Sequence, residues 1–528
     1  MSARSFCWTL VLLMIPVSVS AQGAPTSGEP VRPPTWSGDV AKIIYDNCTS
    51  CHRPGESAPF PLTSYAETKK RALMIQHVTE DRLMPPWHPA KGHGEFLDEM
   101  RLSDAEIATL RRWVEAEMPE GDPKSAPKAP TYPAGWQLGE PDMVVTMSEE
   151  FQVPAGGPDI YRNFVIPLNL KEDKWVKAVE VRPAARTVVH HVLFFLDDTG
   201  SARELDKQDK TPGFRSMGFR RTGSLGGWAV GGIPRKLPGD LAMALPKGSD
   251  LILASHFHPS GKAERERTTI GLYFQDKPPS KTLTGFQVPP AYGALANINI
   301  PAGEKAYTVK QSFKLPCDIE LVSVGAHAHY LGKSMTATAT LPDGTVKKLF
   351  HIPDWDFNWQ TRYTYKERVK LPKGTVVHAT VVFDNSADNP HNPSDPPKRV
   401  KWGLQSTDEM GSVIFSCVMG DEKDLALFRA ADQARKLNRR ARDRLKVVLQ
   451  QLRSMDRNGD KVVSADELVG PWKRALDRLD LDGSGAIEFS EIELAESRLF
   501  GGDSKRKPKP KPEPKSRPEP KTGKKRFF

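Results

Sequence analysis

The feature that most constrains the fold is a series of short β-type segments between Gly135 and about Asp421. Runs of β-branched and aromatic residues alternate there with turns of Pro, Gly and Asp, a pattern typical of antiparallel sandwiches. Because about 290 residues exceed one sandwich, we expect two in tandem, of jelly-roll type, at 138–282 and 283–422. The clearest runs are 161–168, 188–196, 251–257, 319–326 and 375–383.

A helical segment with a Cys-x-x-Cys-His run precedes these strands. Cys48 and Cys51 follow a short amphipathic helix predicted over 39–47, so both sulfurs lie on one face and can reach the vinyl groups of a porphyrin. His52 would then be the proximal iron ligand. The alternative for this run alone is a structural zinc site.

A second helix is predicted over 103–117, opened by a capping box of Ser103 and Glu106. With this helix, segment 36–121 resembles the small c-type cytochromes. For the whole chain we therefore expect a mainly β fold flanked by helical domains. Met84, between prolines that keep the backbone extended, is the expected sixth haem ligand. The competing candidates are Met74, His77 and His88.

The N-terminus predicts export. Residues 1–21 combine Arg4 with a short apolar stretch and small residues before Gln22, which is typical of a signal peptide and predicts a periplasmic or secreted protein. In that compartment Cys317 and Cys417 can form a disulfide bond, the alternative being two separate buried thiols.

The net charge of +10 does not indicate nucleic-acid binding. Residues 504–528 contain eleven Lys and Arg against two Glu, which leaves the rest of the chain nearly neutral. We expect 501–528 to be a disordered Lys/Pro-rich tail and 122–137 to be a linker. No segment is long and apolar enough to predict a transmembrane helix.

A histidine series within the β region indicates metal binding. His327 and His329 alternate on one strand, so both imidazoles point to the same face. Met410 can add a soft thioether that favours copper, although a single Met more often fills a core. His190 and His191 are ambiguous, because neighbours on a regular strand face opposite sides. His256-Phe-His258 permits one or two ligands.

The order of these motifs resembles the copper type II, ascorbate-dependent monooxygenases, the family of peptidylglycine- and dopamine-hydroxylating enzymes. The matching text spans 138–422 and comprises Val-His-His-Val at 189–192, Ser-His-Phe-His at 255–258, Ala-His-Ala-His-Tyr-Leu-Gly at 326–332 and Glu-Met at 409–410. The resemblance implies an electron-transfer copper on His190, His191 and His256. It implies an oxygen-activating, catalytic copper on His327, His329 and Met410, and a structural role for His258.

The resemblance implies that O₂ hydroxylates a C–H bond of a small-molecule or peptide-like substrate. Gly325 stands where peptide-amidating members carry an arginine that holds the substrate carboxylate, which argues against peptidylglycine. A tethered haem would supply electrons beside, or instead of, an ascorbate-like reductant or another cytochrome. The alternatives are a non-catalytic haem and copper carrier, and a scaffold whose metals are structural.

The segment 423–500 predicts a long helix followed by two loops with EF-hand spacing. Lys461 stands where glycine is usual in the first loop, so we expect weaker binding or a strained turn there. Calcium would rigidify this end of the chain. The expected ligands are Asp456, Asn458, Asp460, Val462, Ser464 and Glu467 in the first loop, and Asp480, Asp482, Ser484, Ala486, Glu488 and Glu491 in the second.

Overall fold

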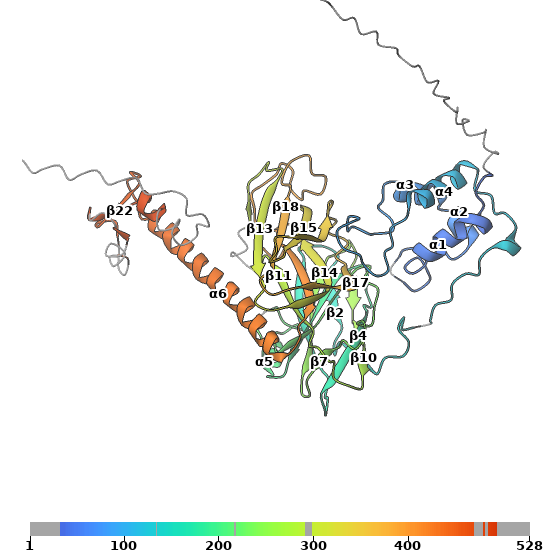
Figure 1. Cartoon of the computed structure of the whole chain (residues 1–528), viewed down its shortest axis with the longest axis horizontal. Coiled ribbons are helices and arrows are strands. Elements are labelled where there is room, and N and C mark those ends of the chain that lie inside the picture. The colour runs from blue at the N-terminus through green and yellow to red at the C-terminus, as the bar shows by residue number, and fades with distance from the viewer. Residues whose placement is uncertain are drawn as a thin grey trace, which may run out of the picture. The chain divides into compact units, whose positions relative to one another are not determined.

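The computed structural model describes residues 32–56, 58–133, 135–215, 218–290, 298–468, 472, 479–480 and 484–493, without the side chains of 437–446. The predicted signal peptide, the predicted tail and Asp482 lie outside these residues. The chain divides into two compact units (Figure 1). One comprises Met1–Trp87 and Glu99–Tyr132, and the other comprises His88–Asp98 and Pro133–Phe528.

The first unit is helical and has its own core. Trp36, Ile44, Leu110 and Trp113 are buried together, which holds the two predicted helices against each other. The capping box of Ser103 and Glu106 opens the second of them as expected. The elements are η1 (Trp36–Val40), α1 (Ala41–Asn47), α2 (Tyr65–Lys69), α3 (Ala72–Glu80), α4 (Asp104–Glu115) and η2 (Pro123–Ser125).

The second unit is mainly β, as predicted, and its first half is a pair of four-stranded antiparallel sheets. The strand orders are β1-β10-β4-β7 and β3-β8-β5-β6. Apolar residues from both sheets, such as Leu272 and Leu253, share one buried cluster, so the sheets pack face to face. The strands are β1 (Met143–Thr146), β3 (Ile160–Pro167), β4 (Lys174–Arg182), β5 (Val189–Asp197), β6 (Gly223–Ala229), β7 (Met243–Leu245), β8 (Asp250–Phe257) and β10 (Thr269–Gln275).

The second half repeats this arrangement with sheets β11-β20-β14-β17 and β13-β18-β15-β16. The ring of Phe286 on β11 lies 5.6 Å from that of Phe313 on β13, which joins the two sheets. The strands are β11 (Thr284–Val288), β13 (Tyr307–Lys314), β14 (Ile319–Ala328), β15 (Gly332–Thr340), β16 (Val346–Ile352), β17 (Arg362–Leu371), β18 (Val376–Phe383) and β20 (Gly411–Val418).

The remaining elements extend these sheets or follow them. The long helix α6 (Glu422–Arg453) begins directly after the second half, with Asp421 as its N-cap. The others are α5 (Ser201–Gln208) and three pairs of short strands: β2 (Phe151–Val153) with β9 (Glu264–Glu266), β12 (Asn299–Ile300) with β19 (Val400–Lys401), and β21 (Val462–Ser464) with β22 (Ala486–Glu488).

Segment His88–Asp98 belongs to the second unit, which corrects the expected continuous domain 36–121. Its backbone pairs with β16 and β17, where Ala90 N–H donates to His351 O (2.7 Å) and Leu97 N–H donates to Thr364 O (2.8 Å). Phe96 is 2% exposed because it packs among aromatic rings of those strands. A segment this short has no hydrophobic periodicity from which its pairing could be predicted.

The expected disulfide is not formed. Cys317 and Cys417 are both free, buried thiols, which was the alternative. Cys417 lies within β20, and the sulfur of Cys317 faces the carbonyl oxygen of Asp424 at 3.6 Å. Burial raises the pKa of Cys317 to about 11. Both thiols are therefore protonated and unreactive at neutral pH.

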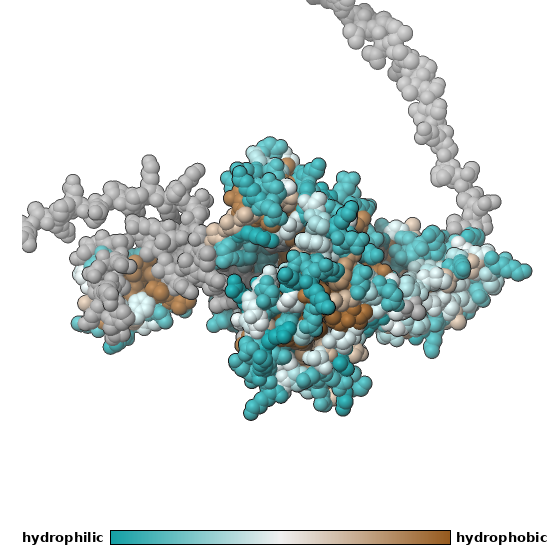
Figure 2. Space-filling model, turned by 90° about the horizontal axis from the view of Figure 1, so that it is seen from below, coloured by the Kyte–Doolittle hydropathy of each residue, from teal (hydrophilic) through white to brown (hydrophobic). Residues whose placement is uncertain are grey.

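The described surface is largely polar. The face in Figure 2 is mainly hydrophilic, with hydrophobic residues in small groups. Over the described residues, the structure has no helix that is both long enough and apolar enough for a membrane span.

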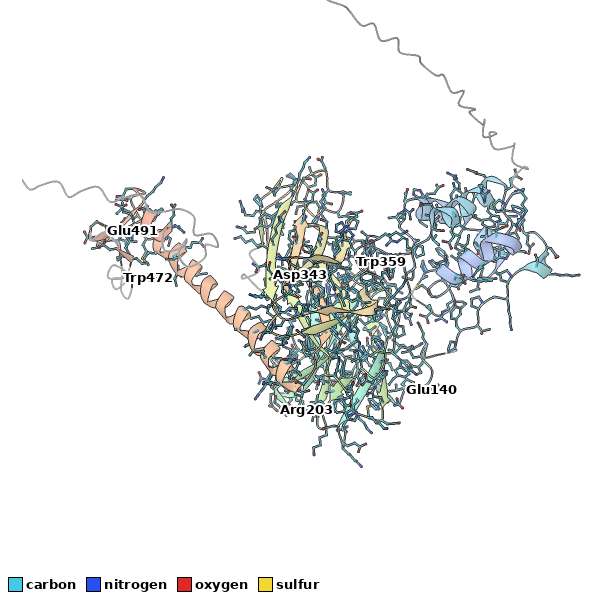
Figure 3. The ribbon with its side chains drawn as sticks, in the orientation of Figure 1. Glu140, Arg203, Asp343, Trp359, Trp472 and Glu491 are labelled. Atoms are coloured by element: carbon cyan, nitrogen blue, oxygen red, sulfur yellow. The ribbon has the colours of Figure 1, made fainter. Side chains whose placement is uncertain are left out.

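The two halves of the β unit contact each other closely. Leu241 of the first half is buried with Val322 and Val418 of the second. Gly231 has a φ of +78°, and a Cβ there would lie 2.4 Å from the ring of Trp359 (labelled in Figure 3). Only glycine allows this approach.

Gly231→Ala should therefore lower the free energy of unfolding by roughly 2–4 kcal/mol, through overlap with Trp359 added to backbone strain. Thermal denaturation would measure the change. Gly248→Ala is the matched control, since Gly248 has a similar φ of +76° and open space around its Cα. Equal losses in both variants would show that the contact with Trp359 contributes nothing.

Candidate metal centres

The first histidine group lies on two paired strands of the first sandwich. β5 carries His190 and His191, and β8 carries His256. The register of these strands shifts between Val189 and His191, so His190 is an extra residue in the ladder. This irregularity lets two neighbouring histidines join one group, which regular strand alternation would forbid.

Three ring nitrogens of this group converge. The Nδ1 atom of His191 lies 3.1 Å from Nδ1 of His190 and 3.4 Å from Nδ1 of His256. Nitrogen ligands bound ~2.0–2.1 Å from one tetrahedral ion lie ~3.4 Å apart. The spacing of the three imidazoles therefore fits one metal ion.

The outer nitrogens of two of these rings face acceptors. His190 Nε2 donates to the carbonyl oxygen of Phe357 (3.3 Å), and His256 Nε2 lies 3.3 Å from the carboxylate of Asp159. The proton that His190 holds on Nε2 leaves the lone pair on its Nδ1, directed at the shared point. This tautomer is the one that metal binding needs.

Burial keeps the imidazoles of His190 and His191 neutral. Removal from water, reinforced by neighbouring His256, lowers the pKa of His190 to about 3. The same causes lower the pKa of His191 well below its usual value. These two rings therefore offer lone pairs at neutral pH.

The second group lies in the second sandwich. His327 and His329 sit at the end of β14, and Met410 directly precedes its neighbour β20. His327 Nε2 is 3.3 Å from Met410 Sδ, and the two imidazole centroids are 5.2 Å apart. The strand register thus brings together all three predicted ligands across 80 residues of sequence.

In this group the ring nitrogens that point away from Met410 are again bound by acceptors. His327 Nδ1 donates to Gln360 Oε1 (2.6 Å), and His329 Nδ1 donates to the carbonyl oxygen of Asp408 (3.2 Å). Burial lowers the pKa of His329 to about 3 and lowers that of His327. The Nε2 lone pairs of both rings are therefore free for a metal beside the thioether.

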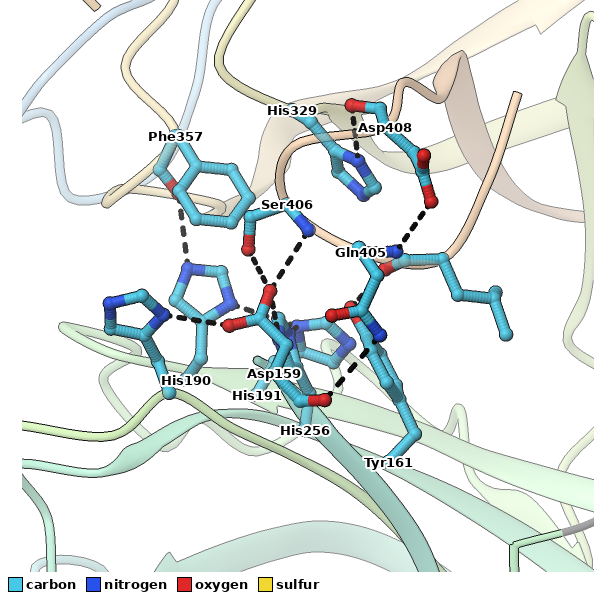
Figure 4. Close-up of polar contacts among 12 residues, drawn as sticks. Asp159, Tyr161, His190, His191, His256, His329, Phe357, Gln405, Ser406 and Asp408 are labelled. Carbon is cyan, nitrogen blue, oxygen red and sulfur yellow. Dashed lines mark hydrogen bonds and ion pairs between the residues drawn. The ribbon is translucent and has the colours of Figure 1, made fainter. Parts of the chain in front are cut away.

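The two groups are adjacent. The ring centroids of His191 and His327 are 6.4 Å apart. Phe357 lies between the groups: its ring stacks on His190 at 4.4 Å and meets His329 edge-on at 5.8 Å. Figure 4 shows the rings of His190, His191, His329 and Phe357 together with Asp159, which belongs to the first sandwich.

His258 lies outside the first group. It is the partner of Asp159, to which its Nδ1 donates at 2.7 Å, and its side chain is 54% exposed. Burial opposes ionisation of Asp159, but hydrogen bonds from His256, Ser406 and His258 outweigh it and lower the pKa of this carboxyl.

Several residues around the site could not be predicted from the sequence, because only the strand register and long-range contacts bring them there. Asp159, Phe357 and Gln360 hold histidine nitrogens, as described above. Arg362 on β17 is the register partner of Gly325 and donates to Ser416 Oγ (2.8 Å). The residue paired with Gly325 thus carries a guanidinium, and this group is bonded to Ser416.

Glu409 is a further buried residue beside the ligands. Its carboxyl group accepts backbone N–H groups of His329 (2.5 Å), Leu331 (3.0 Å) and Met410 (2.8 Å). Burial raises the pKa of Glu409 to about 8 despite these bonds. One side chain thus holds both ligand-bearing backbone segments.

In the first unit, Cys48 ends α1, and Cys51 and His52 form the next turn. His52 Nδ1 donates to Phe60 O (3.1 Å), which leaves Nε2 as the free nitrogen. Burial lowers the pKa of His52, so the ring is neutral. These features fit an axial haem ligand.

The candidates for the sixth ligand differ in placement. Met84 and Met74 belong to the first unit, where Met74 on α3 is 53% exposed. His77 lies 3.5 Å from Asp81 on the same helix. His88 belongs to the second unit. Met84 therefore stays the predicted ligand.

The two acidic loops after α6 are paired through β21 and β22, where Val463 is opposite Ile487. Asp456 accepts the N–H groups of Gly459 (2.7 Å) and Lys461 (3.0 Å). Asp480 accepts those of Ser484 (3.0 Å) and Gly485 (2.9 Å). Trp472 and Glu491 mark this region in Figure 3.

The ends of the loops close in the same way. Glu467 accepts from Arg457 N (2.7 Å) and Ser464 N (2.9 Å), and Glu491 accepts from Glu488 N (3.0 Å). Asn458 and Asp460 bond each other in the first loop (2.8 Å). In the described residues, the carboxylates of Asp456, Glu467, Asp480 and Glu491 thus bond to backbone N–H groups of their own loops.

Comparisons with known proteins do not assign a family. No family model matches the chain, and no curated protein matches it. Among solved structures, the chain is similar to the capsid protein P2 of bacteriophage PM2 (9% identity, TM-score 0.24, covering 53% of this chain and 98% of that chain). It is also similar to PNGase F of Flavobacterium meningosepticum (10%, 0.22, 53% and 97%). Likenesses this weak carry no functional argument.

The first loop allows a test of calcium binding. Lys461 has a φ of +66°, the strained conformation predicted at this position, whereas Gly485 occupies the corresponding place at +84°. Lys461→Gly should remove roughly 1 kcal/mol of strain and tighten calcium binding by roughly fivefold. Calorimetric titration would measure it, with Lys423→Gly in α6 as a control for the lost charge. Unchanged affinity would mean that the first loop does not bind calcium.

Proposed function

We propose that this chain is an exported copper monooxygenase that hydroxylates a C–H bond of a small-molecule or peptide-like substrate with O₂. The observation that carries the proposal is the convergence of five imidazoles and one thioether into two adjacent groups, with the outer ring nitrogens of His190, His327 and His329 bound by acceptors. Chance clustering of core histidines would not orient the lone pairs inward. The two groups fall on the residues that the family resemblance assigns to two coppers.

The donor sets differ in a way that suits two roles. Three imidazoles around His191 form a set that holds copper in either oxidation state, whereas a thioether on Met410 favours Cu(I). When bound, the copper ions would supply the two electrons that reduction of O₂ and hydroxylation of a C–H bond require.

The protein would prepare the site in three ways. Gln360 and the carbonyl oxygen of Asp408 keep the ligand tautomers of His327 and His329. Phe357 keeps water away from the space beside His190, on which it stacks. Arg362, on the strand beside β14, would offer a positive charge to an anionic group of the substrate.

The other parts of the chain would serve this reaction. The first unit would be a c-type cytochrome in which Cys48 and Cys51 hold the haem and His52 ligates its iron. Electrons would come from this haem, from an ascorbate-like reductant or from another cytochrome. The loops after α6 would be an EF-hand pair that calcium stabilises, and the two β halves would be jelly rolls.

The thioether provides a test that separates an enzyme from a carrier. Met410→Leu keeps the volume but removes the sulfur, so O₂ consumption by the reduced, copper-loaded protein should fall at least ~100-fold. Copper bound by the first group should remain. Met335→Leu on β15 is the control, because Met335 is a core methionine. Unchanged O₂ consumption in Met410→Leu would show that the active centre is not at Met410. If the unaltered protein consumes no O₂, the non-catalytic carrier is favoured.

The haem ligand can be tested separately. Met84→Ala should leave the reduced iron five-coordinate, so that the haem binds carbon monoxide, which a six-coordinate haem with a strong thioether bond excludes. Absorption spectra would report the change. Met74→Ala should behave as the unaltered protein does. If Met84→Ala does not bind carbon monoxide, another side chain is the sixth ligand.

A further inference from the structure

One carboxylate connects the two sandwiches at the candidate metal centres. Asp159 lies directly before β3 of the first sandwich, and its side chain is only 5% exposed. On its own side it faces His256 Nε2 (3.3 Å) and accepts from His258 Nδ1 (2.7 Å). The ring of Tyr161, two residues later, stacks on His256 at 4.3 Å and 12°. Asp159 and Tyr161 therefore fix one ligand of the first group.

The same carboxylate also binds the second sandwich. Asp159 Oδ2 accepts the backbone N–H of Ser406 (2.9 Å) and its hydroxyl group. The backbone carbonyl of Asp159 accepts from Gln405 Nε2 (3.4 Å), and the hydroxyl of Tyr161 donates to Leu404 O. Residues 404–406, nearly 250 positions away in the sequence, are thus held at the first histidine group (Figure 4).

Residues 404–406 lead directly into the second group. The carboxylate of Asp408 accepts from Gln405 N (3.2 Å), and its backbone carbonyl accepts from His329 Nδ1 (3.2 Å). Met410 follows two residues later. We call residues 404–410 the Met410 loop. Its inner end supplies one ligand and orients another, while its outer end is bound to Asp159.

We propose that Asp159 is a positioning residue that latches the Met410 loop of the second sandwich onto His256 of the first, and thereby sets the distance between the two metal ions. This inference rests on the proposed function for the metals, but the latch itself consists of contacts within the chain. The short separation of His191 and His327, 6.4 Å between ring centroids, is what the latch would maintain.

Two roles for Asp159 can be distinguished at Ser406: a latch needs the Ser406 hydroxyl, whereas local support of His256 does not. If Asp159 only oriented His256, the hydroxyl of Ser406 would not matter to either metal. If it latches the loop, removing that hydroxyl should separate the metals although no ligand and no neighbour of His256 in its own sandwich has changed. Ser406→Ala is therefore the decisive variant.

The experiment uses the full chain loaded with Cu(II) and measures the dipolar coupling between the two coppers by continuous-wave EPR, which reports short metal–metal distances. We expect strong coupling in the unaltered protein, and weaker coupling in Ser406→Ala and Asp159→Asn with both coppers retained. Ser386→Ala is the matched control, because its hydroxyl makes the same kind of bond to Asp384 (2.7 Å) in a loop of the same sandwich. It should leave the distance unchanged.

A second measurement does not need copper. In the metal-free chain, backbone hydrogen exchange of residues 404–410 should accelerate at least severalfold in Ser406→Ala and Asp159→Asn, and not in Ser386→Ala. Unchanged exchange and an unchanged copper distance would each overturn the latch. Failure of the unaltered chain to bind copper would instead overturn the proposed function, and the exchange result would still decide the latch.

Discussion

The structure of the candidate centres depends on one constraint, the fixed orientation of buried imidazoles. A histidine ring has two nitrogens, and only the one without a proton can bind a metal. At His190, His327 and His329, acceptors from backbone and side chains bind the proton of the outer nitrogen, and burial lowers the pKa of the ring. The inner lone pairs are therefore arranged before any ion binds, at a desolvation cost that the β-sandwiches must offset.

The two sandwiches carry this arrangement because each ligand sits on a strand or directly beside one. Backbone ladders on both sides of β8 and β14 fix the positions of His256 and His327. Contacts between the halves, through Leu241 and through the close approach of Gly231 to Trp359, hold the two groups near each other. The interface between the two halves is thus part of the candidate metal centres. Because the halves pack closely there, residues of one half contact the histidine group of the other.

Much of this organisation could be predicted from the sequence. The alternation of β-branched runs and turns predicted an antiparallel β unit, and the Ser103–Glu106 pair located a helix start. His327 and His329 were predictable partners because strand alternation places them on one face. His190 and His191 were not, since their common direction needs a register shift that leaves no mark in composition. Asp159, Phe357 and Arg362 were equally hidden, because their roles arise from contacts across long stretches of chain. The His88–Asp98 excursion and the free Cys317 and Cys417 departed from expectation for the same reason.

Anomalous diffraction at the copper absorption edge, from crystals of the copper-loaded full chain, would locate every bound copper ion. We expect two peaks, one bounded by His190, His191 and His256 and the other by His327, His329 and Met410. A single peak shared by all five imidazoles, or copper bound anywhere else, would contradict the proposal.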